Sequence, residues 1–188
     1  MSQNSVSSSS LRQRMAQAAS ELHRPQALAG AALLAGLHLI LNQFTLPLGP
    51  YLEVGFDFLS TAVTGFLYGP WVAGLSGIIT DLLGHILHPT GPYFPGWTLS
   101  AILMGMLYGL LYFRRPVRLG RVVVTRLIMV AVFNFFLTPF WLHLMYGQAF
   151  ILLSSLRILK NILKFPIDLG LEYFFLKLSD QEVLRRRQ

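Results

Sequence analysis

Leu82–Phe113 reads LLGHILHPTGPYFPGWTLSAILMGMLYGLLYF, 32 consecutive residues without an Asp, Glu, Lys or Arg. Three further uncharged windows of 28, 23 and 30 residues lie at Pro25–Leu52, Phe58–Thr80 and Leu127–Leu156. A membrane-spanning helix needs roughly 20 mostly apolar residues, so each window is long enough to cross a bilayer. Only 12% of the 188 residues are charged, against about a quarter in a soluble domain. The sequence therefore predicts an integral membrane protein.

Clusters of proline, glycine and arginine interrupt the apolar sequence, and proline and glycine end helices because they fix or free the backbone. The breaks fall at residues 47–50, 69–70, 88–92, 114–121 and 147–148. They predict an all-α six-transmembrane-helix bundle over residues 25–178, with segments 26–44, 54–69, 71–87, 95–113, 122–146 and 150–177. Residues 1–24 are expected to be a mobile N-terminal tail, and residues 179–188 a basic C-terminal tail.

The loops differ in their content of arginine and lysine. These residues gather before the first segment, in Arg114–Arg121 and at the C-terminal end, whereas the loops at 45–53, 88–94 and 147–149 have none. Cytoplasmic loops of membrane proteins carry the excess of Lys and Arg, so we expect both termini in the cytoplasm. The net charge of +7 is then a signal of orientation, and no nucleic-acid partner is expected.

Eight ionisable residues fall within the predicted segments, where a charge is costly and usually faces a partner or a cavity: Asp57, Asp81, Arg126, Arg157, Lys160, Lys164, Asp168 and Glu172. We expect Lys164 to pair with Asp168 four residues on, and Arg126 to pair with Glu172. Arg157 and Lys160 have no acid nearby in their own helix, so they are predicted to bind an anionic ligand, with Asp57 as the alternative internal partner.

Two polar residues midway along other segments are further candidates. Asp81 could accept hydrogen bonds from a ligand amide or amidine, or it could pair with Lys164. Asn134 could contact a ligand or join two helices, since its amide both donates and accepts hydrogen bonds. The outer loop adds Tyr93, Phe94 and Trp97, which suit either an interfacial aromatic belt or stacking on a flat heterocycle.

No catalytic set is visible. Asp81, His85 and His88 could suggest a metal site on one helical face, but no second carboxylate or cysteine completes it. No P-loop or Gly-rich nucleotide motif occurs either. We therefore expect no enzyme activity, metal or cofactor. A metal-dependent membrane enzyme is the alternative from another class, and a structural or channel-like protein would bind no saturable ligand.

The first segment contains Ala27, Ala31 and Ala35, spaced four residues apart. Small residues at this spacing let helices approach closely in lipid. Two interpretations fit equally well: packing within the chain's own bundle, or docking to another subunit.

Several motifs resemble a known family. Six short spans with an Ala-x-x-x-Ala first helix resemble the S components of energy-coupling factor (ECF) vitamin transporters. Four further stretches resemble the folate-specific members of this family. They are GFLYGP at 65–70, DLLG at 81–84, YFPGWTLSA at 93–101, and RILKN at 157–161 with Pro166. The resemblance covers about residues 27–178, and the 93–101 motif is its most specific part.

The resemblance implies capture of folate from outside the cell without catalysis, with outer loops 45–53 and 88–97 closing over the vitamin. It also implies assembly with a transmembrane T component and two ATPases in a bacterial plasma membrane, and it favours docking through Ala27, Ala31 and Ala35. An S component for riboflavin or pantothenate is the nearest alternative. The expected ligand-binding residues are Asp81, Tyr93, Phe94, Trp97, Thr98, Asn134, Arg157, Lys160 and Asn161.

Overall fold

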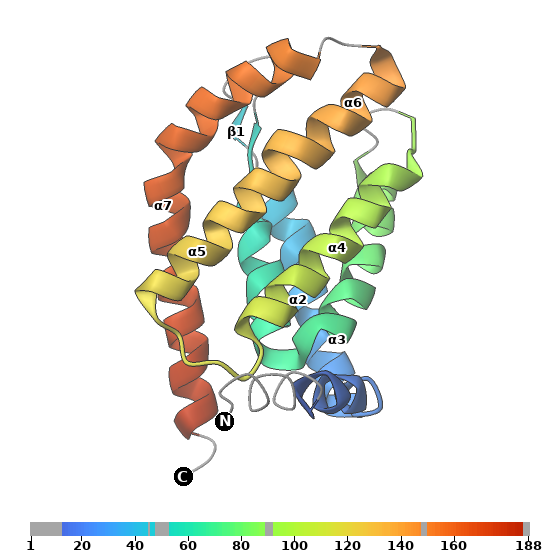
Figure 1. Ribbon diagram of the computed structural model, residues 1–188. Helices are drawn as coiled ribbons and strands as arrows, with labels where there is room; N and C mark the ends of the chain where they lie inside the picture. The colour runs from blue at the N-terminus through green and yellow to red at the C-terminus, as the bar shows by residue number, and fades with distance from the viewer. Residues whose placement is uncertain (1–12, 45, 48–52, 89–91, 148–149, 186–188) are drawn as a thin grey trace, which may run out of the picture.

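The computed structural model describes residues 13–44, 46–47, 53–88, 92–147 and 150–185, although no side chains are described at 46–47, 53–54, 146, 150–163 and 183–185. This part of the chain is almost entirely helical (Figure 1). The helices are α2 (Pro25–Gln43), α3 (Phe58–Leu87), α4 (Pro95–Tyr112), α5 (Leu119–Met129), the π-helix η1 (Val130–Leu137), α6 (Thr138–Tyr146) and α7 (Phe150–Arg185). Residues 13–21 are also helical, and β1 (Leu46–Pro47) pairs antiparallel with β2 (Glu53–Val54).

Helix α3 contains a reversal of the chain at Gly69, which has φ +83° and ψ −178°. Glycine adopts a positive φ without the steric cost that a Cβ would bring, and Pro70 starts the next helical stretch because its N–H is not needed there. Thr61 before the turn and His85 after it line the same cavity, so the two halves run side by side. The predicted break at residues 69–70 is confirmed, and the segments predicted at 54–69 and 71–87 are these two halves.

The segment predicted at 122–146 is part of one continuous helical path from α5 through η1 to α6. The π-helix in its middle was not predicted. Pro139 has no N–H to donate four residues back, and the N–H of Thr138 instead donates to the carbonyl of Phe133, five residues back. A proline of this kind disturbs the regular ladder, and π-turns are a common way to accommodate the change.

The second half of α3 packs tightly against α4. A Cβ built on Gly77 would lie 2.5 Å from the carbonyl oxygen of Ala101, and one built on Gly105 would collide with the carbonyl of Ala73. Side chains larger than hydrogen are therefore excluded at both positions. Close backbone approach through small residues is the usual way in which helices associate in lipid.

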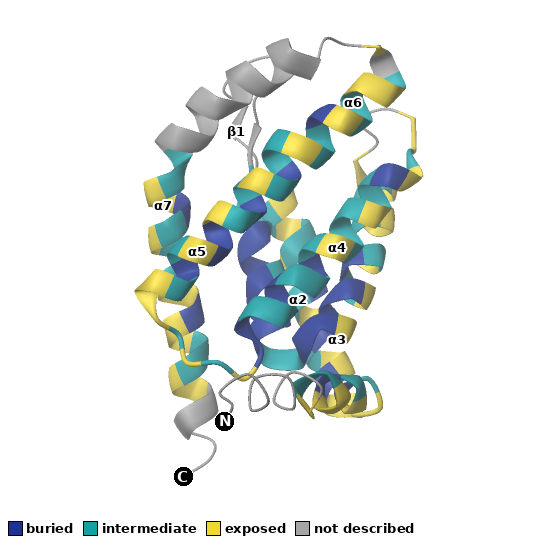
Figure 2. Cartoon of the chain, viewed as in Figure 1, coloured by how far each residue is buried: buried dark blue, intermediate teal, exposed yellow. Residues whose placement is uncertain are grey.

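Large apolar side chains also face outward (Figure 2). Leu33 is 78% exposed, Ile86 72% and Phe136 61%. A soluble protein rarely exposes large contiguous apolar patches, whereas lipid tails solvate them. By length and composition, three helical stretches among the described residues could each cross a membrane: α2, α3 and Leu119–Met145. The count of six crossings stays a prediction.

The basic segments gather at one end of the bundle. Figure 1 shows the helical residues 13–21, the connection from α4 to α5 and the C-terminal part of α7 at the bottom, and β1 at the top. At the basic end, burial together with the nearby charges of Arg14 and Arg121 lowers the pKa of Arg115. β1, in the first of the predicted loops without Lys or Arg, lies at the opposite end of the bundle (Figure 1). Which end faces the cytoplasm stays a prediction.

Part of the N-terminal tail is packed on the bundle. Ala18 is fully buried, and a Cβ built on Gly69 would lie 2.9 Å from the Cβ of Ala18. Glu21 pairs with Arg24 at 3.2 Å and with Arg114 at 3.9 Å. We expected residues 1–24 to be a mobile tail; residues 13–21 instead form a helix that seats against the turn at Gly69, and residues 1–12 lie outside the described part.

Candidate functional site

A cavity of about 570 Å³ opens between α2, both halves of α3, α4 and the η1–α6 region. This volume lies within the range of about 300–1,000 Å³ that is typical of small-molecule sites. Its lining combines aromatic rings with polar side chains from segments far apart in the sequence. The polar and aromatic residues are His38, Asn42, Gln43, Asp57, Thr61, Thr80, Asp81, His85, His88, Tyr93, Phe94, Trp97, Ser100, Phe133, Asn134 and Thr138.

Asp81 carries a directional chain of hydrogen bonds. Thr98 Oγ1 donates to Asp81 Oδ2 at 2.6 Å, and Tyr93 OH lies 2.6 Å from the same Thr98 oxygen. A hydroxyl has one hydrogen, so the Tyr93 phenol donates to Thr98 when Thr98 donates to the carboxylate. These two hydrogen bonds hold one oxygen of Asp81 and orient the carboxylate in the cavity wall. Asp81 can then accept further hydrogen bonds from a ligand with N–H donors.

Aromatic rings form the wall beside this carboxylate. Phe94 meets Trp141 edge to face at 5.4 Å between centroids, and Trp141 meets Phe140 in the same way at 4.9 Å. The indole of Trp141 donates to Ser100 Oγ at 2.8 Å. Trp141 does not line the cavity among the described residues, but it supports Phe94, which does. Flat aromatic surfaces of this kind suit a planar heterocycle.

A second polar group lies on the wall formed by α2 and the start of α3. His38 Nδ1 is 3.2 Å from Thr61 Oγ1, and His38 Nε2 is 4.0 Å from Asp57 Oδ2. Asp57 is predicted from the sequence only as a partner for Arg157 and Lys160, and His38 and Thr61 are not among the predicted site residues. The signal that could have found them is a set of polar side chains within otherwise apolar helices, which usually face a cavity or a partner.

The structure brings together most of the residues that the sequence singled out. Asp81, Tyr93, Phe94, Trp97 and Asn134 line the cavity, and Thr98 reaches it through Asp81. The predicted ligands on α7, Arg157, Lys160 and Asn161, lie outside the described side chains.

The predicted internal ion pairs are confirmed. Arg126 pairs with Asp168, and its other guanidinium nitrogen lies 3.6 Å from Glu172 Oε2. Lys164 Nζ lies 3.5 Å from Asp168 Oδ2, so the alternative of Lys164 pairing with Asp81 is wrong. The phenol of Tyr112 donates to Glu172 at 2.6 Å. We call Arg126, Lys164, Asp168 and Glu172 the buried ion cluster.

The prediction of a docking surface at Ala27, Ala31 and Ala35 needs correction. These alanines are 4%, 6% and 6% exposed, because the face that they form on α2 is covered by the rest of the chain. The other interpretation, packing within the bundle, is the one that the structure shows. The outward face of α2 instead carries larger apolar residues, including Leu33 and Ile40.

The possible metal ligands also lie in the cavity wall. Asp81, His85 and His88 all line it, but His85 packs its ring against Tyr93, with centroids 5.5 Å apart. The described residues contain no group of three or more His, Cys, Asp or Glu side chains placed to hold a metal ion.

Comparison with known proteins identifies relatives of this chain. A family model described as "ECF transporter, substrate-specific component" matches residues 26–173. The chain is 31% identical over 150 residues to a protein named folate transporter FolT from Clostridium novyi (strain NT), covering 80% of this chain and 87% of the relative. It is also 31% identical over 151 residues to a FolT of Leuconostoc mesenteroides subsp. mesenteroides, covering 77% and 81% of the two chains.

A solved structure has the same architecture. It is described as the crystal structure of FolT bound with folic acid, and it matches with a TM-score of 0.76 and 30% sequence identity. The match covers 83% of this chain and 98% of that one.

Proposed function

The chain belongs to the substrate-specific components of ECF transporters, and we propose that the substrate it captures is folate. A member of this family binds a substrate for transport and is not an enzyme. The observation that carries the choice of folate is the Asp81 carboxylate, oriented by Thr98 beside an aromatic wall in a cavity of about 570 Å³. The FolT names of the relatives support the same choice.

The chemistry of folate matches this wall. Its pterin ring presents adjacent N–H donors, an exocyclic amine and a ring N–H, along one edge. A carboxylate such as Asp81 accepts both, and hydrogen bonds to a charged group are roughly twice as strong as neutral ones. Tyr93, Phe94 and Trp97 supply apolar rings for the flat pterin, and Asn134 supplies an amide at the same cavity.

The glutamate end of folate needs cations. The cavity lining that the structure describes contains Asp57, Asp81 and three histidines but no lysine or arginine. We therefore assign the two carboxylates of folate to Arg157 and Lys160, with Asn161 beside them. These residues lie on the N-terminal half of α7. Lys160 and Asn161 follow Arg157 by three and four residues, so all three lie toward one helical face.

Transport requires partners. The family assignment supports assembly with a transmembrane T component and two ATPases, which supply the energy for release of the vitamin into the cell. It also supports a multi-pass location in the cell membrane, with the loops that lack Lys and Arg and the cavity mouth facing outward.

Binding of folic acid to the purified full-length chain tests the proposal. We expect saturable one-to-one binding with Kd below about 1 μM, equivalent to about −8 kcal/mol, measured by calorimetry or by quenching of tryptophan fluorescence. Riboflavin and pantothenate in tenfold excess should not compete. If folic acid does not bind, or if riboflavin displaces it, the substrate of this protein belongs to a different class.

The cation assignment has its own test. Arg157→Ala and Lys160→Ala should each weaken folic acid binding by about 1.5–3 kcal/mol, since each removes a charge-assisted hydrogen bond. Pteroic acid, which lacks the glutamate, should be affected much less. Lys177→Ala is the matched control, because Lys177 lies on the same helix, is exposed and faces Tyr173. Equal binding by all three variants would return Arg157 and Lys160 to a structural role.

A further inference from the structure

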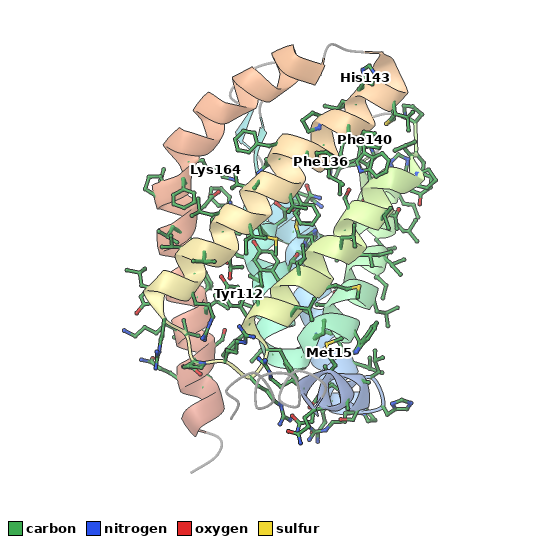
Figure 3. All side chains as sticks on the ribbon, viewed as in Figure 1. Met15, Tyr112, Phe136, Phe140, His143 and Lys164 are labelled. Atoms are coloured by element: carbon green, nitrogen blue, oxygen red, sulfur yellow. The ribbon has the colours of Figure 1, made fainter. Side chains whose placement is uncertain are left out.

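We infer that Lys164 is a positioning residue for the substrate cavity. It holds in place the segment that contains Asp57, a residue of the cavity wall. This inference rests on the proposed function for its ligand, but its geometry lies outside the cavity. Lys164 is 14% exposed, does not line the cavity among the described residues, and extends from α7 toward the interior of the bundle (Figure 3).

Lys164 joins two distant parts of the chain. Its ammonium donates to the carbonyl oxygen of Gly55 at 2.8 Å and lies 3.5 Å from Asp168 Oδ2. Gly55 belongs to the short stretch between β2 and α3, 109 residues away in sequence. An ammonium has three N–H donors, so it can hold both acceptors at once. The backbone at Gly55 is thereby tied to a charged group in the middle of α7.

Aromatic rings add to this attachment. The Lys164 nitrogen lies 5.9 Å from the ring centroid of Phe56 and 5.3 Å from that of Phe58. Phe58 is buried, and the guanidinium of Arg126 lies over its ring at 4.0 Å. Such cation–π contacts are stronger when they are removed from water. Phe56 and Phe58 therefore fix the chain on both sides of Asp57.

Asp57 is the residue that this arrangement places. It lines the cavity, and its carboxylate lies 4.0 Å from His38 on the opposite helix. Asp57 immediately precedes α3, where the helix dipole stabilises a negative charge. The carbonyl of Asp57 accepts a helical hydrogen bond from the N–H of Thr61 at 3.4 Å, so Asp57 moves with the first turn of α3. Gly55 precedes that turn, and its attachment to Lys164 sets where the chain enters the helix and hence where this part of the cavity wall lies.

Lys164 is itself held by the buried ion cluster. Asp168 is shared between Lys164 and Arg126, and Glu172 lies against Arg126 and Tyr112. Two cations and two anions balance within a low-dielectric interior, where removal of one partner leaves an unpaired charge. The cluster therefore provides a rigid base from α5 and α7, and Lys164 transmits that rigidity to Gly55 and the cavity wall.

The experiment compares Lys164→Met with the double variant Lys164→Met/Asp168→Asn. The double variant leaves Arg126 and Glu172 as a balanced pair, so it removes the Gly55 donor without an unpaired charge. Lys177→Met is the matched control for loss of a lysine from α7, and Lys164→Arg keeps both charge and donor. Each variant is titrated with folic acid and with pteroic acid, and amide hydrogen exchange of ligand-free protein is followed by mass spectrometry.

We expect the two variants that contain Lys164→Met to bind folic acid and pteroic acid about tenfold more weakly, by the same factor for each ligand, because a smaller fraction of the protein has a competent cavity. Exchange should rise in peptides covering residues 53–58 and stay unchanged in those covering 95–105. Lys164→Arg and Lys177→Met should behave like the wild type.

Two results would overturn the inference. A loss confined to folic acid would mean that Lys164 contacts the glutamate directly, and unchanged exchange at residues 53–58 in the double variant would mean that Lys164 does not hold this segment. If the wild-type chain fails to bind folic acid, the proposed function fails, while the exchange measurement still decides the role of Lys164.

Discussion

At the scale of single residues, the carboxylate of Asp81 shows what a membrane interior demands of a charged group. An ionised side chain there needs compensation, and Asp81 receives it from Thr98, which in turn accepts from Tyr93. The same hydrogen bonds that make the charge tolerable also orient it. Asp168 and Glu172 are compensated differently, by cations, and take no part in the cavity lining that the structure describes.

Substitution of Thr98 by valine tests the orientation of Asp81. Valine has nearly the shape of threonine but no hydroxyl, so Asp81 loses its donor while packing is kept. We expect folic acid affinity to fall roughly tenfold, which corresponds to about 1.4 kcal/mol, as measured by calorimetry. Thr98→Ser keeps the hydroxyl and should retain most of the affinity; equal affinities in both variants would show that Thr98 does not set the geometry of Asp81.

At the scale of helices, the spacing of small residues on α2 predicts close packing but not the partner against which the helix packs. The alanine spacing on α2 correctly indicates a smooth face for close packing. It cannot say whether that face meets the chain's own α3 or another protein, because both partners require small residues. In the structure, Ser60 on α3 donates to the carbonyl of Leu34 on α2, and the alanines are buried.

Neighbouring alanines on α2 allow a direct test. Ala31 is buried and Ala32 is exposed, so Ala31→Trp must force a large ring into a filled interior, at a cost of about 1–3 kcal/mol or more. We expect Ala31→Trp to lower the melting temperature of the purified protein and to weaken folic acid binding, and Ala32→Trp to leave both unchanged. A stable Ala31→Trp protein that binds normally but does not transport would restore the docking interpretation.

At the scale of the whole molecule, charge is segregated by position along the bundle. The arginine-rich connection between α4 and α5, the helical residues 13–21 and the end of α7 share one end (Figure 1). By comparison, the charged residues inside the bundle include nearly equal numbers of cations and anions. The charges that predict the orientation in the membrane and those proposed to bind the ligand are therefore separate groups.

The absence of cysteine from the sequence makes the orientation easy to test. Single cysteines at Arg118 and Pro92, both exposed positions, should react with a membrane-impermeant maleimide from opposite sides of intact cells. We expect Pro92→Cys to be labelled from outside and Arg118→Cys only after permeabilisation. The reverse pattern would contradict the predicted sidedness, and labelling of both from outside would contradict the single crossing predicted between Pro92 and Arg118.

Much of the fold follows from local patterns in the sequence. Uncharged windows of membrane-spanning length, punctuated by proline and glycine, predicted helices close to those observed, including the break at Gly69. The pairs of Lys164 with Asp168 and Arg126 with Glu172 were also predicted, because a charge in a membrane needs an opposite charge nearby. The π-helix at 130–137 and the helical residues 13–21 were not, since the former depends on how Pro139 is accommodated and the latter on contact with Gly69.

The sequence alone identifies a helical membrane protein, predicts the orientation of its basic segments, and makes Asp81 and the aromatics near Trp97 candidates for a site. These properties depend on composition and spacing along one chain. The three-dimensional structure was needed to show that His38 and Thr61 share the cavity with Asp81, that the alanine face of α2 is buried, and that Lys164 reaches Gly55. Each of these arrangements brings together segments that are separated in the sequence, and no local pattern specifies which segments meet.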